Sequence, residues 1–301
     1  MLDVAPWANL VDGGPRNKVA VVRRSRLVHR LASEPSDQLF IGDYRSPFMQ
    51  HLALRQPHDY VWLLDDGLGT IETWRRRTDP QAAVTRAAPS WLRQVLSAKL
   101  LRLESGDVER LRYFTFFNLT PSETELVTVN RLAWLRGRLP AGPPDERTLF
   151  LGSPFVEIGK MTEDHYVSLL ASVAAQRGAI DYRPHRRENP HKLARLAQID
   201  HLTVVDASGT IELVLTQQPT LPKQVLSFAS SATYSIYKLV GDRVRVGTYA
   251  LEPTDFLDDW FATGDGVPAL LEQSGGKIAL EAMPGRPSDY LSRYQPVTGE
   301  S

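Results

Sequence analysis

The chain has 301 residues with 35 basic and 35 acidic side chains, so its formal net charge is zero. This balance argues against nucleic acid as a partner. The absence of cysteine excludes disulfides, thiolate metal sites and cysteine nucleophiles. With 42% hydrophobic and 23% charged residues the composition is that of a globular protein, and the length predicts about two domains.

The N-terminal stretch MLDVAPWANLVDGG lacks a basic start followed by a long apolar run, and no segment reaches the roughly 20 apolar residues of a spanning helix. We therefore expect a cytoplasmic protein. The arginine-rich stretch from Trp74 to Arg77 raises the alternative of a peripheral contact with the inner face of the membrane, but a solvated helix face is the favoured interpretation.

Apolar, β-branched runs alternate with helical patterns in the first half of the chain. Residues 18–23 (KVAVVR), 38–43 (QLFIGD) and 60–67 (YVWLLDDG) are predicted to be strands, and Pro47 to Arg55 a helix. Continuous apolar runs bounded by turn residues are typical of strands buried on both faces of a parallel sheet. Residues 91–111 carry Leu and Val at helical spacing and are predicted to be helical.

A proline-rich segment, LPAGPPDE at 139–146, is predicted to be a linker, and the alternating pattern restarts beyond it. The first new strand is expected at 148–155 (TLFLGSPF), followed by a helix from Thr162 to Arg177 whose first turn is bracketed by Thr162 and His165. Further strands are expected at 179–185 (AIDYRPH), 201–206 (HLTVVD) and 224–231 (QVLSFASS), with a short helix at 193–198 (LARLAQ).

Two consecutive α/β patterns predict an α/β protein with two Rossmann-like domains facing each other across a cleft. The N-terminal domain is expected over residues 1–140 and the C-terminal domain over 147–290, with a tail at 291–301.

The first motif with chemical potential is Asp65-Asp66-Gly67, which follows the apolar strand YVWLL. Ligands of open α/β sheets bind at such carboxyl ends. Two adjacent carboxylates repel each other, so one of them can have a raised pKa and act as a general base toward a hydroxyl. A polar turn closed by Gly67 is the simpler structural alternative.

The second motif, Tyr182-Arg183-Pro184-His185-Arg186-Arg187-Glu188, also follows a predicted strand. Three arginines around one histidine are explained if they bind a phosphate or carboxylate, with the imidazole as a general acid. A solvated basic loop is the alternative.

The third motif is Ser227-Phe228-Ala229-Ser230-Ser231-Ala232, at the end of a predicted strand. Hydroxyls and amides at a helix N-terminus form a phosphate site, although N-capping alone also explains the serines. No metal site is predicted, and Asp258-Asp259 is assigned to the solvated face of a helix in FLDDWF.

Taken in order, the three motifs resemble those of the bacterial sialyltransferases, especially the lipooligosaccharide sialyltransferases and the capsular polysialyltransferases. That family has an acidic-acidic-Gly, a His-Pro and a Ser-Ser or Ser-Thr motif, which correspond here to Asp65-Asp66-Gly67, His185-Arg186 and Ser230-Ser231. The context is also similar over roughly residues 18 to 250, with LFIGDY before LLDDG, LFLGSP opening the second half and TIE before the serines. Arg186 stands where the family has proline.

The resemblance implies a GT-B architecture and an inverting, metal-independent transfer of sialic acid from CMP-Neu5Ac to a glycan hydroxyl. It implies that Asp65 deprotonates the acceptor, with Asp66 as the alternative base, and that His185 protonates or hydrogen-bonds the departing phosphate. The other donor-binding residues that it implies are Arg183 beside the histidine, Ser230 and Ser231 at the phosphate, Glu212 at the ribose hydroxyls, and Gly152, Ser153 and Arg186 near the nucleotide.

Two alternatives stay open for the function. The donor can carry another CMP-activated acid, such as Kdn, legionaminate, pseudaminate or Kdo, because Arg186 alters the loop after the histidine. The protein can also be a non-catalytic CMP-sugar-binding partner in surface-glycan assembly, because fold alone does not establish activity. The joint presence of Asp65 and His185 argues against this second alternative.

Overall fold

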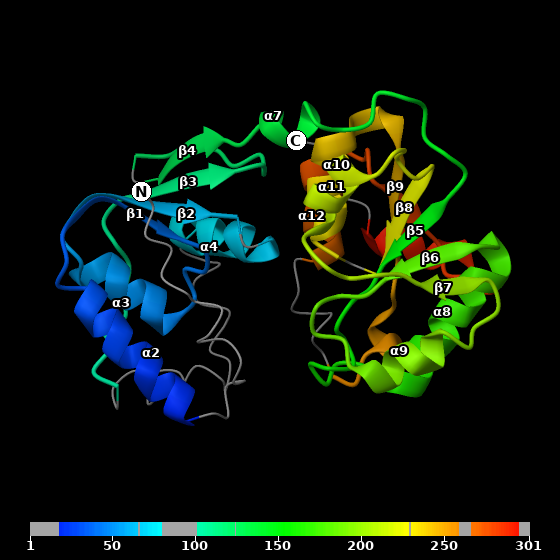
Figure 1. The fold of residues 1–301 in the computed structure, drawn as a ribbon, viewed down its shortest axis with the longest axis horizontal. Coiled ribbons are helices and arrows are strands. Elements are labelled where there is room, and N and C mark those ends of the chain that lie inside the picture. Colours follow the sequence, from blue (N-terminus) through cyan, green and yellow to red (C-terminus); the bar gives the residue numbers. More distant parts are fainter. Residues whose placement is uncertain are drawn as a thin grey trace. The chain divides into compact units, whose positions relative to one another are not determined.

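The computed structural model describes residues 18–65, 67–79, 101–123, 125–228, 230–258 and 266–294. The chain forms two α/β units, which divide between Asn130 and Arg131 (Figure 1). Segment 139–146, which we expected to be a linker, is hydrogen-bonded within the second unit. The amide of Asp145 donates to Leu221 O over 2.9 Å, and Arg243 donates to Gly142 O over 2.9 Å.

The first unit contains a four-stranded parallel sheet in the order β1-β2-β3-β4. Register pairs include Phe40 with Trp62 and Leu64 with Phe114. Figure 1 shows α2 and α3 on one side of this sheet. The elements are α2 (Lys18–Leu31), β1 (Ser36–Ile41), α3 (Pro47–Arg55), β2 (His58–Leu64), α4 (Leu68–Thr78), β3 (Leu111–Thr115) and β4 (Glu125–Val129).

Residues 18–23 are helical, so the strand predicted there is wrong. They open α2, in which Ser25 and Val28 are buried and Leu31 is half-buried. This spacing of three residues is that of one helix face, and Val28 packs in a cluster with Leu52 of α3. Packing of this face therefore overrides the strand preference of the local valines.

Within the described residues, helices pack on one face of the first sheet, which corrects the expectation of strands buried on both faces. Phe40, Tyr60 and Phe114 point to the other face and remain 55%, 44% and 38% exposed. The strand order explains this asymmetry. The right-handed crossovers from β1 to β2 and from β2 to β3 move in the same direction across the sheet, which places the described connecting helices α3 and α4 on one face.

The helix predicted over residues 91–111 is wrong in its described part. Residues 101–110 form turns and irregular chain, and β3 begins at Leu111. The apolar side chains in this stretch pack at separate places instead of along one helix face. Leu103 packs with Val28 and Leu52, and Val108 is buried beside Tyr44. Residues 91–100 lie outside the described residues.

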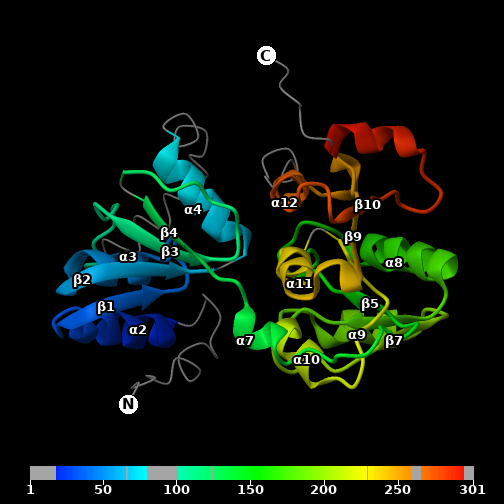
Figure 2. The ribbon, with the colours of Figure 1, turned by 90° about the horizontal axis from the view of Figure 1, so that it is seen from above.

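The second unit contains a six-stranded parallel sheet in the order β10-β9-β8-β5-β6-β7. Figure 1 shows α8 and α9 on one face and α10, α11 and α12 on the other, and Figure 2 shows the same two layers from above. The elements are α7 (Ala133–Arg136), β5 (Thr148–Leu151), α8 (Glu163–Arg177), β6 (Ile180–Arg183), α9 (Pro190–Leu196), β7 (Leu202–Val204), α10 (Ile211–Gln217), β8 (Gln224–Ser227), α11 (Ala232–Val240), β9 (Arg245–Tyr249), α12 (Gly266–Ser274) and β10 (Ala279–Glu281).

Renumbered within the unit, this sheet has the strand order 3-2-1-4-5-6 of the Rossmann fold. Its core is aromatic: Phe150 of β5 stacks on Tyr182 of β6 and meets Phe228 edge to face. Helix α8 begins as expected, because the Thr162 side chain accepts a hydrogen bond from the amide of His165. The predicted α/β fold class with parallel sheets in two units is confirmed.

Residues 256–258 of FLDDWF are not helical, contrary to the prediction, and residues 259–261 lie outside the described part. Asp258 instead forms a 2.6 Å ion pair with Lys160. Within the described residues, no helix combines the length and the apolar character that crossing a bilayer requires.

Candidate active site

The predicted donor-binding residues gather at one edge of the six-stranded sheet. Gly152 follows β5, Arg183 ends β6 and Ser230 follows β8 by three residues. The strands β5 and β8 are neighbours, and the chain leaves them toward opposite sides of the sheet. This arrangement is the topological switch point, where open α/β sheets bind their ligands beyond the carboxyl ends of the strands.

Gly152 and Ser153 are held by packing within this edge. The amide of Gly152 donates to Arg183 O over 2.9 Å, and the buried Ser153 hydroxyl donates to Phe228 O over 2.7 Å. A Cβ atom on Gly152 would lie 2.1 Å from Glu188 Oε1 and 2.5 Å from Tyr182 Oη. Glycine is therefore required here by the side chains beneath it.

Arg183 is buried, and its guanidinium is bound by backbone carbonyls. It donates to Asp206 O and Ser208 O over 2.6 Å each and to Gly209 O over 2.8 Å. Burial lowers the pKa of Arg183, while the carboxylates of Asp206 and Glu212 oppose this effect. Arg183 thus fixes the loop after β7 without any anionic ligand, whereas Arg186 and Arg187 are exposed.

Glu212 and the two serines lie at the starts of neighbouring helices. Glu212 is in the first turn of α10 and accepts a hydrogen bond from Ser235 of α11. Ser231 occupies the N-cap position of α11 but makes no side-chain cap hydrogen bond, so N-capping does not explain this residue. Ser230 and Ser231 are both half-buried and lie beyond the carboxyl end of β8.

His185 begins a tight turn after β6. The amide of Glu188 donates to His185 O over 2.9 Å, which closes a four-residue turn with Arg186 and Arg187 at its centre. Arg186 occupies the position of a β-turn at which proline is favoured. A proline after the histidine, as in the family's motif, would have its favoured place in this turn.

The imidazole of His185 is half-buried and lies in a positive environment. Burial lowers its pKa, and the charges of Arg186, Arg187 and Lys192 add to this effect, while Glu157 opposes it. The amide of Arg187 donates to His185 Nδ1 over 3.2 Å.

A buried ionic cluster supports this turn, and the sequence analysis assigned it no role. The Glu188 carboxylate accepts hydrogen bonds from the His185 amide over 2.7 Å and from Tyr182 Oη over 2.6 Å. Lys192 Nζ, fully buried on α9, lies 3.0 Å from Glu188 and 3.1 Å from Glu157. The sequence signal was the Glu188 to Lys192 spacing of four residues, which pairs side chains at the start of a helix.

Asp65 lies at the carboxyl end of β2 in the first unit, as predicted. Its Oδ1 accepts from Thr115 Oγ1 over 2.5 Å and its Oδ2 from the amide of Phe116 over 2.9 Å. Burial raises the pKa of Asp65 to about 6, although hydrogen bonds from Thr115, Phe116 and Thr70 oppose the rise. A carboxylate with this pKa is mostly ionised at pH 7 and can still accept a proton. Asp66 lies outside the described residues.

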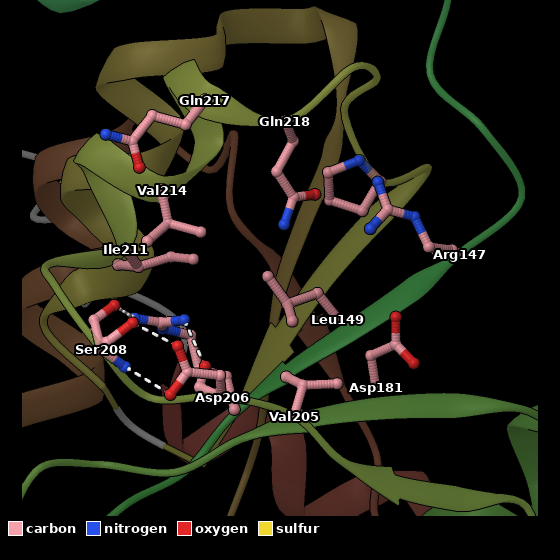
Figure 3. A pocket seen from close by; sticks show the side chains of 12 residues that line it. Arg147, Leu149, Asp181, Val205, Asp206, Ser208, Ile211, Val214, Gln217 and Gln218 are labelled. Carbon is pink, nitrogen blue, oxygen red and sulfur yellow. Dashed lines mark hydrogen bonds between the residues drawn. The ribbon is translucent and has the colours of Figure 1, made fainter.

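A pocket of about 330 Å³ lies between α10 and the β5–β6–β7 part of the sheet (Figure 3). Asp206 and Ser208 lie at one end and Arg147 at the other. Among the predicted site residues that the structure describes, only Arg183 lines it. The other lining residues include the apolar side chains Leu149, Val205, Ile211 and Val214 and the amides Gln217 and Gln218.

No group of three or more His, Asp or Glu side chains in the described part of the chain is placed to hold a metal ion. No protein-family model matches the chain, and no curated protein is significantly similar to it. A solved structure, the crystal structure of Acinetobacter baumannii MurG, matches 91% of this chain and 67% of its own, at 12% identity and a TM-score of 0.38. A similarity this weak assigns neither fold nor activity, so the fold assignment here is based on the strand order.

Proposed function

We propose that this protein is a glycosyltransferase that transfers sialic acid from CMP-Neu5Ac to a hydroxyl of a lipooligosaccharide, capsular or other surface glycan. Anomeric configuration would be inverted in one displacement without a metal. The observation that carries the proposal is that Arg183, His185 and Ser230 lie at or beyond the carboxyl ends of strands in a Rossmann-ordered sheet, with Glu212 in the first turn of α10.

The donor's phosphate would bind at the carboxyl edge of β8 and β6. Developing negative charge on a leaving phosphate is stabilised by donors that are already in place. The Ser231 hydroxyl, which makes no cap hydrogen bond, is a donor of this kind, as are the backbone amides at the start of α11 and the imidazole of His185. Glu212, held by Ser235, is the candidate for the ribose hydroxyls.

The nucleoside would extend toward the pocket beside α10. Asp206 lies at one end of this pocket and binds the lining residue Arg183 through its carbonyl, and the walls include the apolar side chains of Leu149 and Ile211. A flat pyrimidine base suits a slot with apolar walls and a few polar groups. Arg183 contributes in this proposal by fixing the loop after β7.

Asp65 would remove the proton from the acceptor hydroxyl. Both carboxylate oxygens are oriented by hydrogen bonds, one from Thr115 at the end of β3 and one from the amide of Phe116 that follows it, and the pKa of about 6 fits a base that works near neutral pH.

The test is the release of CMP from CMP-Neu5Ac by the purified protein in the presence of a chelator. We expect release by the wild type and a loss of at least about 100-fold in Asp65→Asn, the size of a general-base contribution. Thermal stabilisation by CMP should be retained in this variant, because Asp65 belongs to the other unit.

Two outcomes would replace the proposal. Turnover of CMP-Kdo or another CMP-activated acid, without turnover of CMP-Neu5Ac, would keep the glycosyltransferase and change its sugar. Stabilisation by CMP with no consumption of any CMP-sugar would favour a non-catalytic binding protein. At a CMP concentration about 100 times the dissociation constant, bound CMP is expected to raise the free energy of unfolding by about 2.7 kcal/mol. The absence of any stabilisation would contradict both the glycosyltransferase and the binding protein.

A further inference from the structure

The turn after β6 determines which ring nitrogen of His185 carries the proton. The amide of Arg187 points at Nδ1 over 3.2 Å, and the direction of a backbone N–H is set by the chain. A nitrogen that accepts a hydrogen bond must present its lone pair, so Nδ1 is unprotonated. The single proton of the neutral ring is then on Nε2.

Glu188 holds the backbone of this turn from below. Its side chain is completely buried, and it binds His185 twice, accepting from the histidine amide with Oε1 over 2.7 Å and donating its own amide to His185 O over 2.9 Å. Tyr182 and Lys192 in turn hold the carboxylate. Residues 185 and 188 are therefore clamped to each other, and the Arg187 amide lies between them.

The charges around the ring disfavour its cationic form. Arg186 and Arg187 flank it in the turn, Lys192 approaches from α9, and Glu157 on the loop after β5 is the opposing carboxylate. Protonation would also put a proton on Nδ1, against the Arg187 amide. A ring in this setting has an N–H to offer and no readily transferred proton.

We propose that His185 acts as a neutral hydrogen-bond donor of fixed tautomer, which presents Nε2–H to an anionic oxygen of the nucleotide phosphate, and that Glu188 is its positioning residue. This inference rests on the proposed function for the identity of the anion. In this inference His185 binds the phosphate by a hydrogen bond and does not act as a general acid. Phosphate binding then depends on the geometry of the turn at residues 185–188 and not on the basicity of the imidazole.

The transfer step balances without a proton from His185. The acceptor oxygen forms a bond to the anomeric carbon while the bond from that carbon to the phosphate oxygen breaks, and its electron pair leaves with CMP. The acceptor proton goes to the Asp65 carboxylate. CMP departs with its new charge stabilised by Nε2–H and the serine hydroxyls, and solvent protonates it later.

The first test needs no substrate. In protein with ¹⁵N-labelled histidine, long-range ¹H–¹⁵N NMR between pH 6.5 and 8.5 distinguishes the two tautomers and the cation, with His185 assigned by its absence in His185→Gln. We expect His185 to be neutral with Nε2 protonated throughout. A ring protonated on Nδ1, or cationic at pH 7.5, overturns the inference whatever the activity of the enzyme.

The second test compares His185→Gln with His185→Ala in CMP release. Glutamine offers an N–H near the position of Nε2 and cannot supply an acidic proton. We expect His185→Gln to stay within about tenfold of wild type and His185→Ala to lose about 100-fold or more, the usual effect of deleting one oxyanion donor. Equal inactivity of both folded variants would restore the general acid. His191→Gln, on an exposed histidine of α9, is the matched control.

Glu188→Gln tests the positioning role, because a purely structural role would not change the tautomer. We expect this variant to show a mixture of both His185 tautomers and a weaker affinity for CMP. The fall of the turnover rate at low pH, which reports the protonation of Asp65, should be unchanged. A folded Glu188→Gln with pure Nε2–H would contradict the positioning role. A wild-type protein with pure Nε2–H that neither binds CMP nor consumes a CMP-sugar would instead contradict the proposed function.

Discussion

Thr115 donates a hydrogen bond from Oγ1 to Oδ1 of Asp65 over 2.5 Å, so the last residue of β3 holds the carboxylate that follows β2. The next amide, that of Phe116, holds the other oxygen. The two neighbouring strand ends thus orient the carboxylate completely. Burial nevertheless raises its pKa to about 6, so Asp65 is a well-oriented carboxylate in an environment that disfavours its charge.

Asp65→Asn should stabilise the protein at pH 8 and not at pH 4. The folded-state pKa of about 6 exceeds the ordinary aspartate pKa of 3.8, so the stabilisation that protonated Asp65 provides is complete below pH 3.8 and is lost as the pH rises through 6. Asparagine carries no charge, and the gain at pH 8 is up to about 3 kcal/mol. Thermal unfolding at both pH values checks this; an equal effect at both would contradict the raised pKa.

Thr115→Val should shift the pH profile of turnover. The Thr115 hydrogen bond favours the ionised form of Asp65, so its removal raises the pKa of this carboxyl further. We expect the acid limb of the rate profile to move to higher pH, with a loss of about 1 kcal/mol in stability. Thr128→Val, on an exposed residue of the adjacent strand β4, is the matched control and should leave the profile in place.

Gly152→Ala should destabilise the second unit. The added Cβ would lie 2.1 Å from Glu188 Oε1 and 2.5 Å from Tyr182 Oη, so the buried cluster under the turn must shift. Overpacking of this kind costs about 1–3 kcal/mol, measured as the free energy of unfolding in urea. Gly142→Ala is the control, because nothing lies within 4 Å of a Cβ there. Similar effects of the two substitutions would count against this packing.

Lys192→Met should be among the most destabilising single changes. It leaves Glu188 and Glu157 without the buried cation that pairs with both, and breaking a buried pair from one side costs about 3–5 kcal/mol. The double variant Lys192→Met/Glu188→Gln should recover part of this loss in a double-mutant cycle. Lys160→Met, which removes a more exposed pair with Asp258, should cost no more than about 1 kcal/mol. Equal losses of unfolding free energy in Lys192→Met and Lys160→Met would contradict the conclusion that the buried cluster contributes more than a surface ion pair.

Local sequence patterns correctly predicted those elements in which a short apolar run or a helical spacing of apolar residues is packed in the core. The apolar runs at β1, β2, β5 and β6 and the helix over Pro47–Arg55 are where the pattern indicated. The three motifs also fell at strand ends, because a buried run must stop where polar residues and glycine begin. In α2 the same reasoning failed, because four consecutive residues of valine and alanine resemble a strand until the longer helical spacing is included.

The sequence by itself determined the alternation of strands and helices, the order of the motifs and the residue types available for chemistry. Only the tertiary structure decided which partners these residues have. Thr115 lies 50 positions from Asp65, and the carbonyls that bind Arg183 lie 23 to 26 positions beyond it. Burial and hydrogen bonding between distant segments set the pKa of Asp65, and a linear pattern does not carry this property.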